Sequence, residues 1–230
     1  MRKGVQKIYS EVAETYELVN HVLTFGFDIR WRKLVAKSAA KMKGRKILDV
    51  CCGTGEMALS LSRAVIENAE IYLVDFSFPM LDKARQRKYE SYASFILADA
   101  NKLPYEDNTF DLITISFAIR NLNMRKDILL AHLEEFYRIL KPRGTFINVE
   151  TSQPSSPVLK KVFHFYIKTF VQPVGTFISG SQSGYRYLAY TIPRFYSADE
   201  LSFLLKSIGF SQVGHTKKLG GIAAIHEAVK

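Results

Sequence analysis

The chain has 230 residues and a formal net charge of +10, with 47% hydrophobic and 23% charged residues. This balance excludes an intrinsically disordered protein, and the length suits one sizeable α/β domain but is short for two. Lys or Pro interrupts each apolar run before it reaches membrane-spanning length, and the N-terminus leads into a polar helix rather than a signal sequence, so we expect a cytoplasmic protein.

The first 43 residues carry helical apolar spacing with a break at Phe25–Phe27, and they predict helices packed ahead of a sheet. Apolar runs then alternate with helical patterns. We expect strands at 46–51, 70–75, 93–97, 110–116 and 144–150, and helices at 57–65, 77–88 (with Ser77 as N-cap) and 127–140. This alternation predicts a doubly wound, mostly parallel α/β sheet whose ligand crevice lies at the carboxyl ends of the strands.

The pattern changes after residue 150. From Thr151 to Tyr196 the chain has five Lys or Arg and no Asp or Glu, and it is rich in aromatic residues. A helix at 198–208 and two strands at 212–217 and 221–229 follow, and we expect these strands to form an antiparallel edge. The predicted single domain divides into an N-terminal helical cap (1–43), a cofactor-binding core (44–150), a substrate or lid insertion (151–196) and a C-terminal helix with strands (197–230).

The cysteines and histidines give no sign of a metal or a disulfide. Cys51 and Cys52 are adjacent, cannot form an ordinary strain-free disulfide, and are the only cysteines in the chain. The five histidines show no metal-ligand spacing. We therefore predict no metal site.

A glycine turn follows the first expected strand. The apolar run Ile47–Val50 leads to Gly53-Thr54-Gly55, where bare backbone at a strand-to-helix junction can approach a nucleotide. Asp75 lies twenty residues after Gly55, where an acid is expected to bind ribose. Gly53–Ala58 also satisfies the dinucleotide pattern G-x-G-x-x-A, so the turn alone does not identify the nucleotide.

Two carboxylates flank this turn. Asp49 precedes it and Glu56 follows it, at positions where a pyrophosphate needs hydrogen-bond donors and no nearby anions. S-adenosylmethionine (SAM) suits these acids better, because it carries an ammonium and a sulfonium group. We expect one acid, such as Asp49, at the methionine end and Asp75 on both ribose hydroxyls; a solvated or capping Asp49 is the alternative.

Asp99 lies just past the third expected strand. A carboxylate there can accept the adenine amino group while the backbone N–H of Ala100 meets a ring nitrogen. Together with Asp49, the glycine turn and Asp75, this spacing resembles that of the seven-stranded, Rossmann-like SAM-dependent methyltransferases.

The resemblance narrows to the ubiquinone and menaquinone biosynthesis C-methyltransferases and covers nearly the whole chain. The segment that contains Ser116 to Asn121 and the two C-terminal segments are far more specific than the SAM motifs. The matching segments, with the family patterns in parentheses, are Tyr16–Asn20 (Y-D-x-x-N), Leu23–Gly26 (L-S-F-G), Trp31–Arg32 (W-R), Ile115–Asn121 (I-S-F-G-[LI]-R-N), Tyr185–Leu188 (Y-x-Y-L) and Gly220–His226 (G-G-I-x-A-x-H).

The resemblance implies roles for single residues. Arg120, Asn121 and Tyr16 are the candidate catalytic or substrate-binding residues. We hypothesise that Arg120 stabilises a phenolate forming on the acceptor while Asn121 orients it. Guanidinium groups are too weak as bases, so water or a carboxylate receives the proton; a purely structural ion pair is the alternative. The candidate cofactor-binding residues are Asp49, Gly53, Thr54, Gly55, Asp75, Phe76, Asp99, Ala100 and Ser116.

The implied acceptor is a prenylated quinol, of the demethylmenaquinol or demethoxyubiquinol type, at the cytosolic membrane face. Residues 158–178 combine aromatic side chains with Lys160, Lys161 and Lys168, and could receive the prenyl tail while facing anionic headgroups; helical core packing explains the aromatics as well. Another small phenolic or lipid-like acceptor stays open, because the fold does not define the acceptor.

Two further functions are weaker alternatives. The basic charge also suits RNA, but the chain lacks a recognisable RNA-binding module and an Asn-Pro-Pro-Tyr-type motif, so no nucleic-acid partner is expected. Retention of Arg120 and Asn121 argues against a non-catalytic SAM-binding subunit. The sequence does not predict the oligomeric state.

Overall fold

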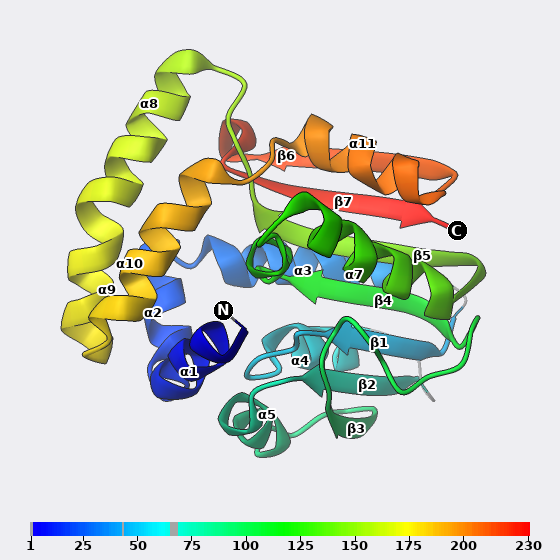
Figure 1. The fold of residues 1–230 in the computed structure, drawn as a ribbon. Helices are drawn as coiled ribbons and strands as arrows, with labels where there is room; N and C mark the ends of the chain where they lie inside the picture. The colour runs from blue at the N-terminus through cyan, green and yellow to red at the C-terminus, as the bar shows by residue number, and fades with distance from the viewer. Residues whose placement is uncertain (1, 43, 65–68) are drawn as a thin grey trace.

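A seven-stranded sheet forms the centre of the molecule (Figure 1). The computed structural model describes residues 2–42, 44–64 and 69–230. The strand order is β3-β2-β1-β4-β5-β7-β6. The strands are β1 (Lys46–Val50), β2 (Glu70–Asp75), β3 (Tyr92–Leu97), β4 (Phe110–Ser116), β5 (Leu140–Thr151), β6 (Gln212–Lys218) and β7 (Ala223–Val229).

The sheet is mostly parallel, as predicted. Neighbouring strands among the first five are parallel to each other, whereas β7 pairs antiparallel with both β5 and β6. The predicted antiparallel edge and the doubly wound α/β class are therefore confirmed.

Helices cover both faces of the sheet. Leu133 of α7 and Leu205 of α11 pack in one buried cluster with Ile113 of β4. Trp31 of α3 and Met57 of α4 belong to a second cluster with other strand residues. The helices of these layers are α3 (Phe27–Ala39), α4 (Glu56–Ser62), α5 (Phe78–Arg85), α7 (Lys126–Ile139) and α11 (Ala198–Ile208).

A third layer of helices lies beyond the end of the sheet toward which β2 and β4 point (Figure 1). A third buried cluster joins its two parts, with Val12 and Val19 from the N-terminal segment and Phe163 and Tyr185 from the insertion. This layer encloses the space beyond the strand ends. Its helices are α1 (Arg2–Val12), α2 (Tyr16–Leu23), α8 (Pro157–Tyr166), the π-helical η1 (Ile167–Val171), α9 (Gln172–Ser179) and α10 (Gln182–Thr191).

Several predicted boundaries differ from the structure. β5 begins at Leu140, which pairs with Phe110, rather than at the predicted residue 144, and its pairing with β4 shifts in register between Phe110 and Leu112. A short helix, α6 (Ile119–Leu122), follows β4 and was not predicted. β7 begins at Ala223 because the 3-10 turn η3 (Leu219–Gly221) precedes it.

The first helix of the core ends at Ser62 rather than at the predicted Val65, which lies outside the described residues, as do Met1 and Lys43. Ser77 occupies the predicted N-cap position of α5, but its side chain makes no capping bond. Its Oγ instead lies 3.1 Å from Ser10 Oγ of α1. None of the described helices combines the length and apolarity needed to span a membrane.

Candidate active site

Two cavities adjoin at the carboxyl ends of the parallel strands. The larger has a volume of about 370 Å³ and is enclosed mainly by the N-terminal helices and α8–α10. The smaller has a volume of about 90 Å³ and lies over the ends of β1, β2 and β4. Tyr9, Tyr16 and Phe117 line both cavities. The two cavities therefore meet at these three side chains.

The glycine turn between β1 and α4 holds the Asp75 carboxylate at the end of β2. The backbone N–H of Gly53 donates to Asp75 Oδ2 and that of Ser77 donates to Oδ1, both at 2.8 Å. Gly55 has a φ of +82°, and a Cβ there would lie 2.3 Å from the Tyr89 hydroxyl oxygen, so only glycine fits. Each Asp75 oxygen keeps a lone pair for a further donor such as a ribose hydroxyl.

Burial raises the pKa of Asp75 to about 6. The carboxylate is therefore mostly ionised at neutral pH, although burial makes its charge costly. Hydrogen bonds from a ligand would stabilise it. Six of the nine predicted cofactor residues line the smaller cavity: Gly53, Asp75, Phe76, Asp99, Ala100 and Ser116.

Three predicted cofactor residues, Asp49, Thr54 and Gly55, do not line either cavity. Asp49 is fully buried in β1, accepts a hydrogen bond from Thr114 Oγ1 at 2.9 Å, and has its pKa raised to about 7 by burial. The Thr54 carbonyl accepts a hydrogen bond from Arg87 Nε at 2.6 Å. Direct contact between SAM and these three residues therefore remains a prediction.

Glu56 is not a free carboxylate beside the turn, and this corrects the charge argument made from the sequence. Arg32 Nη2 lies 3.2 Å from Glu56 Oε2, and His21 Nε2 lies 3.2 Å from Oε1. Arg32 Nη1 also donates to Asp28 Oδ2 at 2.6 Å, and His21 Nδ1 lies 2.9 Å from the same oxygen. These contacts tie α2 and α3 to the first turn of α4.

Glu17 lies beside this group. Ligand atoms of Glu17, His21 and Glu56 lie within 4.8 Å of one another, a spacing that can hold a cation. However, Glu17 is already paired with Arg87, and Glu56 with Arg32. Because arginine side chains already neutralise these carboxylates, the cluster does not argue for a metal.

Arg120 lies in the wall of the larger cavity and is only 5% exposed. Its Nη1 donates to Thr191 Oγ1 at 2.5 Å and to Asn121 Oδ1 at 3.3 Å. Its Nε lies 3.8 Å from Glu150 Oε1 and, within the described ranges, has no hydrogen-bond partner. Asn121 Nδ2 donates to the Tyr9 hydroxyl at 2.6 Å and faces the smaller cavity. Arg120 therefore lines the larger cavity, whereas the adjacent Asn121 lines the smaller one.

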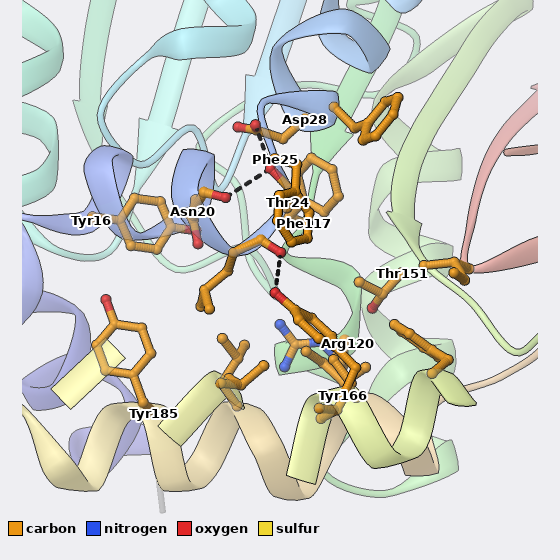
Figure 2. A pocket seen from close by; sticks show the side chains of 18 of the residues that line it. Tyr16, Asn20, Thr24, Phe25, Asp28, Phe117, Arg120, Thr151, Tyr166 and Tyr185 are labelled. Carbon is orange, nitrogen blue, oxygen red and sulfur yellow. Dashed lines mark hydrogen bonds between the residues drawn. The ribbon is translucent and has the colours of Figure 1, made fainter. Parts of the chain in front are cut away.

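The larger cavity is mostly apolar, with a few polar groups. Figure 2 shows Tyr16, Arg120 and Tyr185 pointing into it from three different segments. Burial raises the pKa of Tyr16 above its ordinary value, so its hydroxyl stays protonated at neutral pH. Apolar lining residues include Val12, Leu23, Phe163, Ile167, Val171 and Ile192.

A family model described as the ubiE/COQ5 methyltransferase family matches residues 1–230. The chain belongs to this family. It is therefore a SAM-dependent methyltransferase, as the resemblance in the sequence predicted.

Curated relatives support the assignment to the ubiE/COQ5 family, and solved structures share its fold. Demethylmenaquinone methyltransferases from Staphylococcus aureus strains, including JH9 and Newman, are 36% identical over 231 residues, which covers 100% of this chain and 94% of theirs. A SAM-dependent methyltransferase from Aquifex aeolicus has the same fold, with a TM-score of 0.60, 22% identity, and coverage of 86% of this chain and 88% of that one. Human N-acetylserotonin methyltransferase in complex with SAM shares the fold with a TM-score of 0.62 and 18% identity, over 94% of this chain and 57% of that one.

The structure adds residues for which no role in this methyltransferase was predicted. Tyr9 lines both cavities, and burial raises its pKa well above the ordinary value. Glu150, at the end of β5, accepts hydrogen bonds from the Arg120 and Thr151 backbone N–H groups. Its strand-end position was a usable signal, whereas nothing in the sequence distinguished Tyr9 or Thr191 from ordinary helix residues.

Proposed function

We propose that the chain transfers the SAM methyl group to a ring carbon of a prenylated quinol, of the demethylmenaquinol or demethoxyubiquinol type. The observation that carries this proposal is the meeting of two cavities at Tyr9, Tyr16 and Phe117. One cavity contains the candidate cofactor residues, and the other is apolar with Arg120 in its wall. The 36% identity to demethylmenaquinone methyltransferases supports the choice of acceptor.

The residues of the smaller cavity fit the chemistry of SAM, which supplies an electrophilic methyl group when bound. The lone pairs left on the Asp75 carboxylate accept hydrogen bonds from the two ribose hydroxyls. Asp99 and the backbone N–H of Ala100 bind adenine, while Phe76 and Ser116 complete the wall. These are neutral and anionic groups, so they suit a nucleoside with no phosphate.

The N-terminal helix α1 lies over this cavity. Gln6 Nε2 donates to the Phe76 carbonyl at 2.7 Å, and Ser10 meets Ser77. These contacts hold α1 against the residues that follow β2, so α1 forms part of the wall around the bound SAM.

Arg120 acts on the acceptor. A quinol carbon becomes nucleophilic when the neighbouring hydroxyl loses its proton, and a fixed guanidinium in a water-poor wall stabilises the resulting phenolate. Thr191 and Glu150 hold the guanidinium in place. The proton passes to water or to a carboxylate. Tyr16 stays protonated and donates to the substrate, while Asn121 orients the reacting face through Tyr9.

The enzyme works at an anionic membrane surface on the cytoplasmic side, where an acceptor with a prenyl tail dissolves. The net charge of +10 favours such a surface. The basic segment 151–196 forms helices beside the larger cavity.

The test is incubation with labelled SAM and separate pools of demethylmenaquinol, demethoxylated benzoquinol, a small soluble phenol and total RNA. We expect the label on a ring carbon of one quinol. Label in the phenol alone would favour the small phenolic acceptor, and label in RNA alone would refute the proposed function.

A further inference from the structure

The outer face of α8 is both apolar and basic. Val158, Val162 and Phe165 are spaced four and three residues apart, so they share one face of the helix, and Lys161 lies between them. Val162 is 59% exposed and Phe165 is 64% exposed. Exposed apolar side chains gathered on one face are typical of a binding surface.

This face is continuous with the mouth of the larger cavity. Phe25, Val162 and Leu219 all line the cavity, and all three are also exposed, so they form its rim. Tyr166 joins this rim, because its ring centroid lies 6.1 Å from that of Phe25 and its hydroxyl donates to the Leu23 carbonyl at 2.8 Å. Figure 2 shows Phe25 and Tyr166 at the cavity wall. The cavity therefore opens among apolar side chains on the molecular surface.

The charges of α8 and its neighbours indicate which kind of surface binds over the mouth of the larger cavity. Lys161 is exposed beside the apolar face, Lys168 is exposed in η1 directly after α8, and the sequence from Thr151 to Tyr196 contains no Asp or Glu. Aromatic and aliphatic side chains flanked by lysines suit the boundary between headgroups and acyl chains of an anionic bilayer.

We propose that the outer face of α8 and the rim formed by Phe25, Val162 and Leu219 dock on an anionic bilayer. A membrane-dissolved acceptor then enters the larger cavity directly from the lipid, and its tail stays in contact with apolar atoms throughout. This inference rests on the proposed function, because only an acceptor with a lipid-like tail needs such an entrance.

The binding test uses Phe165→Ser and Lys161→Gln, two exposed residues that do not line the cavity. Phe203→Ser and Lys206→Gln on α11 are matched exposed controls. Co-sedimentation is measured with phosphatidylcholine vesicles, with and without phosphatidylglycerol, at low and high salt. We expect binding to need phosphatidylglycerol and to fall with salt, by roughly tenfold for Phe165→Ser and by about fivefold for Lys161→Gln, with the controls unchanged. Equal binding by all variants, or by both kinds of vesicle, would overturn the proposal.

The activity test separates docking from catalysis. Wild type and Phe165→Ser are assayed with a long-tailed demethylquinol in phosphatidylglycerol-containing vesicles and with a tail-less, water-soluble analogue. We expect the variant to lose rate only with the vesicle acceptor. Equal loss with both acceptors would contradict entry from the lipid. If wild type methylates neither acceptor, the proposed function fails, whereas the vesicle-binding result still decides whether the surface docks.

Discussion

Replacing Arg120 with Met tests whether its guanidinium stabilises negative charge on the acceptor ring. The methionine fills a similar volume but removes the hydrogen bond to Thr191 and the charge that lies 3.8 Å from Glu150. Removal of one donor to a developing oxyanion costs about 3–4 kcal/mol, or roughly 100- to 1,000-fold in rate. We expect a loss of this size in single-turnover methylation at saturating SAM and acceptor.

The same substitution also affects stability, because it leaves the buried Glu150 without its cation. A buried charge that loses its partner costs about 3–5 kcal/mol, although the Thr151 backbone N–H and hydroxyl still donate to Glu150. The double variant Arg120→Met/Glu150→Gln should therefore regain thermal stability but not rate. Arg125→Met is the control, because Arg125 is exposed and pairs only with Asp127 among the described residues. A near-normal rate in Arg120→Met would refute the phenolate mechanism.

Three other outcomes follow from the turn and its acids. Asp75→Asn should weaken SAM binding by roughly 10- to 100-fold in calorimetry, because charge-assisted hydrogen bonds to the ribose are lost. Since burial raises the pKa of Asp75 to about 6, the affinity of the wild type for SAM should also fall as the pH drops below that value. An affinity that does not change with pH would contradict this role. Burial raises the pKa of Asp49 to about 7, so the folded state binds a proton there that the unfolded state releases. The SAM-free protein should therefore lose thermal stability as the pH rises from about 4 to about 7. In melting scans, Asp49→Asn should reduce this dependence of the melting temperature on pH. Gly55→Ala should destabilise the protein more than Gly180→Ala. Both glycines have a positive φ, but only at Gly55 would the added Cβ meet a neighbouring atom, the Tyr89 hydroxyl oxygen at 2.3 Å. Equal melting temperatures of the two variants would show that the Tyr89 contact does not matter.

Strand-end residues were the part of the site that the sequence predicted best. Asp75, Asp99 and Ser116 each follow an apolar run, and parallel strands end at one edge of a sheet, so their shared cavity could be inferred. Local spacing carries this information because each residue is placed by its own strand. Glu56 is different: it flanks the turn in sequence, but its partners Arg32 and His21 come from separate helices. Long-range charge pairing has no local pattern, so the sequence predicted a free carboxylate at Glu56.

By itself, the sequence determined the sheet class, the antiparallel edge, the glycine turn and the methyltransferase family, because alternating periodicity and fixed motif spacings depend on neighbours along the chain. Only the tertiary structure decided that Asp49 is buried in β1 against Thr114, that the two cavities meet at Tyr9 and Phe117, and that Val162 and Phe25 share a rim. These relations join helices and strands that are distant in sequence. Packing between the N-terminal helices, the sheet and the insertion brings them together, and no periodicity in the sequence encodes that contact.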